Sequence, residues 1–227
     1  MPTSDYHEWV KRAQSFVERL PERFAGEIEI NVSVAPPLDE AGMRSIESAL
    51  GFALPRALRV FFREGSGACN CRYVWKPNET ARPVLRSLLD NEDLYGGPYQ
   101  WEAEYLNDHF ASCQEYAEDW NDEGDEGNDK KLWTKSLPFA SIANGDYLAV
   151  SLADGSDDPA VVYLAHEGGS QVIAPSFTQF LAHWERLCYV GPESWLLDNF
   201  LDENGFINAD SEQASRLRAL LGAVEGK

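Results

Sequence analysis

The chain has 227 residues, of which 44% are hydrophobic and 12% aromatic, the composition of a globular protein with a sizeable core and not of a disordered one. Its 38 acidic and 19 basic residues give a formal net charge of −19, which argues against nucleic acid or an anionic membrane surface as partner and favours a basic one. Four thinly spread cysteines, with no apolar run of membrane-spanning or signal-peptide type, favour a cytoplasmic protein with free thiols.

The N-terminal segment predicts a helix followed by a strand. Apolar residues recur at helical spacing over residues 5–20, where Asp5 can serve as the N-cap and Pro21 as the stop. Over residues 28–34, isoleucine and valine then alternate with polar residues, which is the period of a half-buried strand.

Two further helices and two shorter elements follow along the chain. Asp39 is a suitable N-cap for a helix that ends where Gly51 stands at the C′ position. Pro55 suits the start of the next helix, because it has no N–H to leave unpaired. Residues 72–75 favour a short strand, and the leucines of residues 85–89 favour a short helix.

From Leu137 onward the pattern is typical of a β-meander. Apolar stretches at residues 148–152, 161–166 and 171–173 are separated by residues that favour tight turns. The sequence therefore predicts consecutive antiparallel strands in the second half of the chain.

A well-marked helix closes the meander. Ser176 and Gln179 form a capping box at its start, and a last amphipathic helix is expected over roughly residues 211–221. We expect a single α+β domain over residues 1–191 and a C-terminal helical extension over residues 192–227, which either packs on the core or mediates dimerisation.

The segment of residues 90–129 holds 14 carboxylates and no lysine or arginine, so it supplies −14 of the net charge of −19. It is also rich in tyrosine and tryptophan, and aromatics anchor interfaces while carboxylates steer association. This acidic insertion is a candidate surface for a basic partner. An equally open interpretation is a solvated face with core aromatics and a flexible loop at residues 119–129. The residues expected to contact the partner are Asp119, Trp120, Asp122, Glu123, Asp125, Glu126 and Asp129.

No motif for metal binding or catalysis stands out. Two acidic loops fail the EF-hand pattern, because their twelfth positions hold Lys130 and Ser211 and not glutamate. Cys69 and Cys71 have no second pair at zinc-like spacing, and no nucleophile or phosphate-loop signature is present. We therefore expect no metal, no cofactor and no enzymatic activity, although paired carboxylates for glycoside chemistry stay open in so acidic a chain.

Three blocks of sequence, in order over about residues 38–184, resemble one known family. The first is ESALGFALPRALRVFFREGSG, which carries Glu47, Gly51, Leu54, Pro55, Phe61 and Gly67. The second is LPFASIANGDYLAVSL, which carries Pro138, Phe139, Gly145 and Asp146. The third is VVYLAHEGG with IAPSFTQFLAHW, which carries Val162, His166, Ala174, Ser176, Phe177 and Leu181. Together they resemble the SUKH superfamily of Smi/Knr-like proteins.

The resemblance implies an α+β fold with a central, mainly antiparallel twisted sheet flanked by helices. In bacteria it implies immunity proteins that neutralise the toxic domains, often nucleases or deaminases, of polymorphic and contact-dependent toxins. In fungi it implies a regulatory scaffold in cell-wall synthesis. We expect the family-motif residues to have structural roles. These residues are Glu47, Gly51, Leu54, Pro55, Gly67, Gly145, Asp146, Ser176, Phe177 and Leu181.

The sequence thus predicts a non-catalytic protein-binding module, and specifically an immunity protein that occludes a basic toxin domain. A regulatory scaffold related to the fungal proteins is the alternative, and an enzyme is a third hypothesis with no motif behind it. The chain departs from the family pattern in its acidic insertion, its C-terminal extension and Ser66 before Gly67. The oligomeric state does not follow from the sequence.

Overall fold

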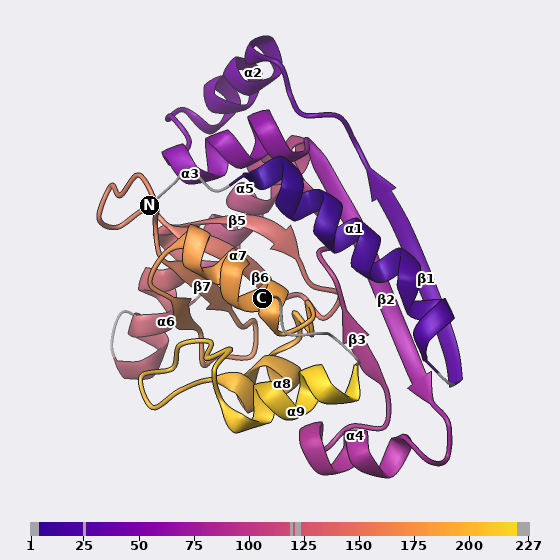
Figure 1. The fold of residues 1–227 in the computed structure, drawn as a ribbon. Coiled ribbons are helices and arrows are strands. Elements are labelled where there is room, and N and C mark those ends of the chain that lie inside the picture. The colour runs from indigo at the N-terminus through magenta and orange to yellow at the C-terminus, as the bar shows by residue number, and fades with distance from the viewer. Residues whose placement is uncertain (1–4, 25, 119, 121–123, 222–227) are drawn as a thin grey trace.

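The structure, a computed structural model, describes residues 5–24, 26–118, 120 and 124–221 (Figure 1). Its longest helix, α1 (Tyr6–Arg23), begins at the N-cap Asp5, whose side chain accepts a hydrogen bond from Glu8 N. The other described helices are α2 (Glu40–Leu50), α3 (Arg56–Val60), α4 (Arg82–Leu89), α5 (Leu106–Glu118), α6 (Gly124–Thr134), α7 (Phe177–Arg186), α8 (Ser194–Leu197) and α9 (Glu212–Leu220).

Two antiparallel sheets carry the strands. In the first, β1 (Gly26–Val34) pairs with β2 (Ala68–Pro77) along its whole length, and β3 (Leu94–Gly96) and β4 (Trp101–Glu102) share the other edge of β2. The second sheet is the predicted meander, and its strands in spatial order are β5 (Ser136–Ser141), β6 (Tyr147–Ser151), β7 (Val161–Leu164) and β8 (Gln171–Ala174). The α+β class is confirmed, with its strands divided between two sheets and not gathered in one central sheet.

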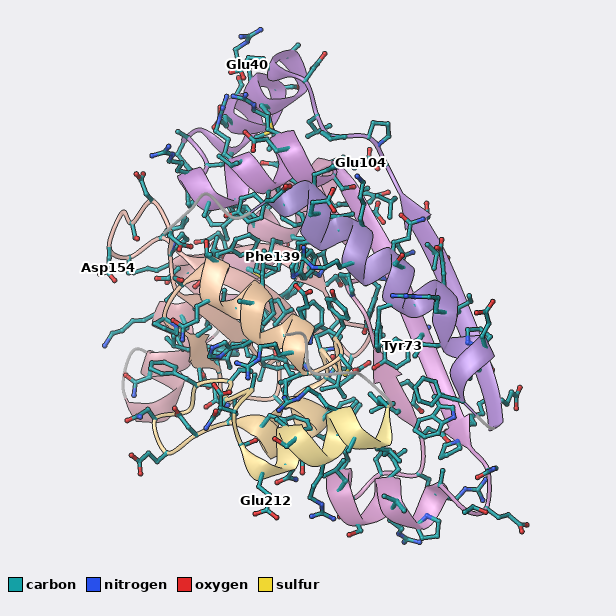
Figure 2. The ribbon with its side chains drawn as sticks, viewed as in Figure 1. Glu40, Tyr73, Glu104, Phe139, Asp154 and Glu212 are labelled. Atoms are coloured by element: carbon teal, nitrogen blue, oxygen red, sulfur yellow. The ribbon has the colours of Figure 1, made fainter. Side chains whose placement is uncertain are left out.

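A stack of aromatic rings joins the two sheets and two helices. Trp101 of β4 lies between Trp9 of α1 and Trp184 of α7, with ring centroids 5.6 Å from each and planes only 14° apart. The ring of Phe139 on β5 meets Trp101 edge-on at 4.9 Å. These rings are buried, and offset or edge-on aromatic pairs add about 0.5–1.5 kcal/mol beyond the area they bury. Phe139 and Tyr73 lie inside the molecule, whereas Glu40, Asp154 and Glu212 project from its periphery (Figure 2).

The second sheet is covered on both faces. Alternate residues such as Leu148 and Val150 belong to the main core, beside α7, while Ala149 and Val162 belong to a separate small cluster under α5 and α6. Strands buried on both faces read as continuous apolar runs, which is why β7 shows four buried residues in succession.

The C-terminal extension packs into the main core. Leu196, Phe200 and Leu217 are buried there, and α9 contacts α4 (Figure 1). Over the described residues 192–221, this extension therefore packs on the core, which is the first of the two alternatives given for it. The domain boundary at residue 191 stays a prediction.

Three sequence-based expectations need correction. Pro21 does not stop α1, because the helix continues to Arg23 and the missing N–H removes only one hydrogen bond of its last turn. The strand expected at residues 72–75 runs from Ala68 to Pro77, since its partner β1 is that long. Pro55 is the N-cap of α3 and not its first helical residue, and a π-helical turn, Phe61–Gly65, extends that helix.

Candidate partner-binding face

The acidic insertion begins with β3 and β4 of the first sheet and continues into a pair of helices, α5 and α6, on the outer face of the second sheet (Figure 1). The cluster beneath them contains Cys113 and Ala117 of α5, Trp133 of α6, and Ala149, Val162 and Leu164 of the sheet. Burial raises the pKa of the Cys113 thiol to about 12, so this cysteine is an inert core residue at neutral pH. The insertion is therefore anchored by its own small apolar core.

Three aromatic rings form one end of this cluster, where Trp133 is buried and Tyr116 and Trp120 are at least partly exposed. Tyr116 is 40% exposed, and its ring centroid lies 4.8 Å from that of Trp133 and 5.4 Å from that of Trp120. Trp120 is half-buried, and Lys130 donates from its Nζ to the Trp120 carbonyl at 2.8 Å. Tyr116 and Trp120 therefore present aromatic surface on the helical pair, and the Glu115 and Glu118 side chains of α5 are also exposed.

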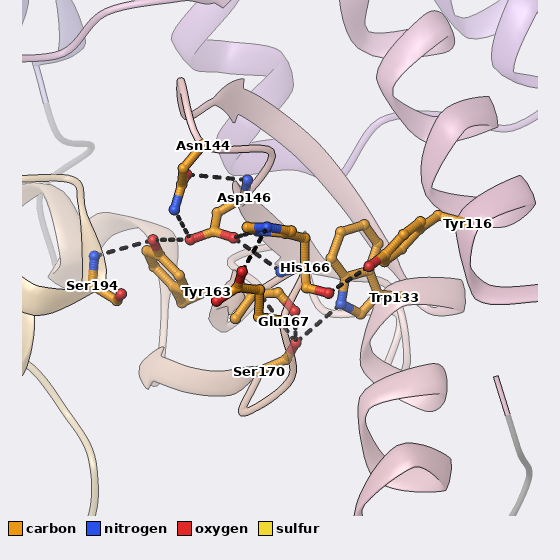
Figure 3. Close-up of polar contacts among 10 residues, drawn as sticks. Tyr116, Trp133, Asn144, Asp146, Tyr163, His166, Glu167, Ser170 and Ser194 are labelled. Carbon is orange, nitrogen blue, oxygen red and sulfur yellow. Dashed lines mark hydrogen bonds and ion pairs between the residues drawn. The ribbon is translucent and has the colours of Figure 1, made fainter.

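The turn between β7 and β8 is bound to this helical pair. The Asp129 carboxylate accepts hydrogen bonds from Gly169 N at 2.9 Å and from Ser170 N at 2.7 Å. Trp133 Nε1 donates to Ser170 Oγ at 3.0 Å, and the Tyr116 hydroxyl donates to the His166 carbonyl (Figure 3). The turn and the aromatic end of the cluster are therefore joined by hydrogen bonds into one continuous structure.

A buried carboxylate, Asp146, organises the other side of the same turn (Figure 3). Its Oδ2 accepts from the Tyr163 hydroxyl at 2.6 Å and from Asn144 Nδ2 at 2.7 Å. Its Oδ1 accepts from His166 N at 2.9 Å and lies 2.7 Å from His166 Nδ1. The Tyr163 hydroxyl in turn accepts from Ser194 N at 3.1 Å, which links the C-terminal extension to this network.

The electrostatics of the network favour an ionised Asp146. Burial opposes ionisation, but hydrogen bonds from Tyr163, from the backbone and ring of His166 and from Asn144 outweigh it, so the pKa of Asp146 is lowered. Burial, and then the neighbouring carboxylate, raise the pKa of Tyr163, which stays a hydrogen-bond donor. The other ring nitrogen of His166 lies 3.7 Å from Glu167 Oε1. The hydrogen bonds of Asp146 therefore order the turn. None of them joins His166 to a serine or cysteine side chain that it could activate as a nucleophile.

The predicted contact residues fall into three groups. Asp119, Asp122 and Glu123 lie outside the described residues, and Asp125 and Glu126 are described only as backbone of α6. Trp120 lies on the aromatic end of the cluster. Asp129 is 7% exposed and its carboxylate serves the β7–β8 turn, so we assign it to the fold and remove it from the contact surface.

Sequence reasoning missed the contribution of the β7–β8 turn to this face. The Glu167 side chain on this turn is 87% exposed, and the turn lies beside Tyr116 and Trp133. No local signal in the sequence joins residues 165–170 to the acidic insertion, since the contact spans some forty residues of chain. We name Glu115, Tyr116, Glu118, Trp120 and Glu167 the acidic–aromatic face.

The family-motif residues make contacts within the fold. Glu47 Oε1 accepts from Leu54 N and from Arg59 Nε, each at 3.1 Å, so it ties α2 to α3. Ser176 Oγ accepts from Gln179 N at 3.1 Å as the N-cap of α7, whose Phe177 and Leu181 are buried.

The glycines and Pro55 of the motif stand at turns and helix ends. Gly51 ends α2 and Pro55 precedes α3. Gly67 N donates to Pro36 O at 3.0 Å, and Gly145 N donates to Ile142 O at 3.0 Å in the turn before Asp146. These contacts join α2 to α3, cap α7 and close the turn before Asp146, so the motif residues serve the fold.

A membrane-spanning helix or a metal-binding cluster in the described part of the chain would indicate another kind of function. Within it, no helix combines the length and the apolar character needed to cross a bilayer. The same residues contain no group of three or more histidine, cysteine, aspartate or glutamate side chains arranged to hold a metal ion.

Comparison with known proteins identifies the family. No curated protein matches the chain. The family profile described as SMI1 / KNR4 family (SUKH-1) matches residues 37–183, which is more than half of the chain. The matched range contains α2, α3, the acidic insertion, the meander and the larger part of α7. This chain therefore belongs to the SMI1 / KNR4 family (SUKH-1).

Proposed function

We propose that this protein is an immunity protein: a non-catalytic module that binds a cognate toxin domain of basic charge and occludes its active site. The observation that carries the proposal is the acidic–aromatic face. It combines the exposed Tyr116 and the half-buried Trp120 with exposed carboxylates, and most of it belongs to an insertion that holds 14 acidic residues and no basic one. Membership of the family supports a protein-binding role.

The chemistry of the face matches a substrate-mimicking inhibitor. A nuclease active site is lined by basic groups that hold phosphate, so a surface with clustered carboxylates competes for those groups. Complementary charge raises the association rate, and a rigid aromatic anchor contributes most of the retained affinity. Because Tyr116 and the β7–β8 turn are held in place by hydrogen bonds, little ordering entropy is lost on binding.

The test is protection and binding against a toxin domain encoded next to this gene. Co-expression should restore growth of cells that produce the toxin domain. The purified pair should associate at least about tenfold more slowly in 0.5 M than in 0.05 M NaCl, as expected for electrostatic steering. Stopped-flow or surface-based kinetics measure this ratio.

Matched variants test the face itself. Glu115→Lys with Glu118→Lys should slow association, and Tyr116→Ala should mainly speed dissociation, because charge steers encounter and aromatic contact retains the partner. Glu18→Lys with Glu22→Lys on α1 makes the same charge change on another exposed surface and should leave protection intact. Absence of protection by the unmodified chain would contradict immunity and favour the regulatory scaffold. If the charge variant at Glu115 and Glu118 and the Tyr116→Ala variant both protected as well as the unmodified chain, the assigned face would be wrong.

A further inference from the structure

Strand β1 forms a long, unpaired edge of the first sheet. Its nine residues pair with β2 on one side, and no described strand pairs with its other side. The pairing with β2 runs from Gly26 to Val34 without a register shift, so no bulge interrupts the edge. Figure 1 shows β1 at the outer margin of the molecule, with α1 on the inner side.

The register identifies the backbone groups that face outward. Ala35 N donates to Ala68 O at 2.8 Å, which continues the β1–β2 pairing by one residue. Because antiparallel strands alternate between bonded and non-bonded pairs, the odd-numbered residues of β1 bond to β2. The N–H and C=O groups of Ile28, Ile30 and Val32 therefore point away from the sheet. Within the described part of the chain, no backbone group outside the first sheet bonds to them.

The edge lacks most of the usual features that block strand addition. Natural edge strands are protected by proline, by charged side chains and above all lysine, by bulges or by short length. Within β1 there is no proline and no lysine, its charged residues Glu27 and Glu29 both pair with Lys76 of β2, and Ile30 at its centre is 41% exposed. Such an edge recruits another strand through its main-chain groups.

The sequence of β1 is complementary to itself. When two copies run antiparallel about a two-fold axis at Ile30, the outward-facing groups of Ile30 meet each other, and those of Ile28 meet those of Val32. In the intervening positions Glu29 meets Asn31 and Glu27 meets Ser33, so like charges never stand directly opposite.

Neighbouring registers are less favourable. Moving the axis to Glu29 places the two Glu29 side chains directly opposite, and moving it to Asn31 leaves Gly26 and Glu27 outside the paired stretch. In the register centred on Ile30, the two Glu29 carboxylates are diagonal neighbours. Each is already paired with Lys76 of its own chain, whose Nζ lies 2.7 Å from Glu29 Oε1.

We propose that this protein forms a homodimer through antiparallel pairing of β1 with β1 of a second copy, centred on Ile30. The two four-stranded sheets then join into one sheet across the two-fold axis. The pairing uses a surface distinct from the acidic–aromatic face, which lies on the other sheet.

The test is the mass in solution as a function of concentration. An interface of two strands belongs to the small class, below about 1,200 Å², so sedimentation equilibrium should extend to about 100 µM. The unmodified chain should approach twice its mass of 25.4 kDa. Ile30→Lys places two ammonium groups face to face and should weaken dimerisation at least about tenfold. Val84→Lys, at another exposed apolar position on α4, should leave it unchanged.

Covalent trapping tests the register independently of these variants. Ile30→Cys should give a disulfide-linked dimer on mild oxidation, because bonded antiparallel partners have Cα atoms about 5.5 Å apart. Ser33→Cys should not, since the two copies of residue 33 are far apart in this register. A chain that stays monomeric at all concentrations, dimerisation that survives Ile30→Lys in a folded variant, or equal cross-linking of both cysteine variants would each overturn the proposal.

Discussion

Glu193 is a buried carboxylate with little compensation for its charge. It is 7% exposed, its Oε1 accepts from the Tyr99 hydroxyl at 3.2 Å, and its Oε2 has no hydrogen-bond partner among the described residues. Burial, which outweighs the hydrogen bonds and the more distant Arg72, raises the pKa of Glu193 above its ordinary value. The folded state therefore favours the protonated carboxyl.

This sign sets a pH dependence. When folding raises the pKa of a carboxyl, its contribution to the free energy of unfolding is fully present below the unfolded pKa, about 4.3, where the group is protonated. That contribution is lost as the pH rises through the folded pKa. We expect Glu193→Gln to be more stable than the unmodified chain at pH 8, with the difference disappearing near pH 4. Urea unfolding at the two pH values measures this, with the exposed Glu104→Gln as the control. A destabilised Gln variant at pH 8 would contradict the assignment.

Asp146 has the opposite behaviour, because its hydrogen bonds lower its pKa despite burial. Its contribution to stability is present above its unfolded pKa, about 3.9, and is lost as the pH falls through the folded pKa. We expect Asp146→Asn to reduce the free energy of unfolding at pH 7 by about 1–3 kcal/mol, since the amide cannot accept every bond that the carboxylate accepts. Urea unfolding should show a smaller difference at pH 3. An equal loss at both pH values would point to shape and not to charge.

At the scale of elements, two glycines with positive φ differ in the space around them. A substitution at one would strain only the backbone, and a substitution at the other would also clash with a neighbouring strand. Gly51 ends α2 at φ 80°, and an added Cβ there would meet nothing within 4 Å. At Gly97, with φ 100°, the same Cβ would lie 1.7 Å from the Cys71 carbonyl oxygen. The loop before Tyr99 therefore lies directly on β2.

We expect Gly51→Ala to fold with a loss of about 1–2 kcal/mol, the cost of a left-handed conformation for an L-residue. Gly97→Ala should fail to accumulate as folded protein, because the added Cβ would overlap the Cys71 carbonyl and that part of β2 is held by its strand pairing. The soluble yield and the thermal unfolding midpoint of the two variants measure the contrast. Similar midpoints for both would show that the loop at Gly97 is free to rearrange.

Elements with local signals were predictable from the sequence, and elements that depend on distant partners were not. The N-caps Asp5, Asp39 and Ser176 were visible because capping involves residues three positions apart. The full length of β2 and the existence of β3 and β4 were missed, since those strands are defined by pairing across the chain. Two sheets in place of one likewise reflect long-range contacts.

The same division holds for the site. The acidity of the insertion follows from composition alone, and so did the expectation that it faces a basic partner. The burial of Asp129 could not be inferred from its neighbours, because it depends on the turn at Gly169 and Ser170. The exposure of Tyr116 and the burial of Trp101 within one insertion equally depend on which sheet each residue meets.

At the scale of the whole molecule, a net charge of −19 makes the folded state repel itself. Salt shortens the Debye length from about 10 Å at 0.1 M to about 3 Å at 1 M, which weakens repulsion between distant carboxylates. We therefore expect the thermal midpoint to rise between 0.02 and 0.5 M NaCl, by about 2–4 °C for each kcal/mol gained. Calorimetry measures the shift, with KCl as the control for ion-specific effects. A falling midpoint would show that surface ion pairs dominate.

The separate cluster under α5 and α6 has a consequence for motion. The apolar side chains of α6, Leu132 and the buried Trp133, belong to this cluster and not to the main core, so α6 can open as a cooperative unit of its own. Backbone amides of α6 should then exchange with deuterium faster than those of β2, which is enclosed between β1 and the core. A toxin domain seated on the acidic–aromatic face would close this opening, so bound protein should show slowed exchange in α6 while β2 is unaffected.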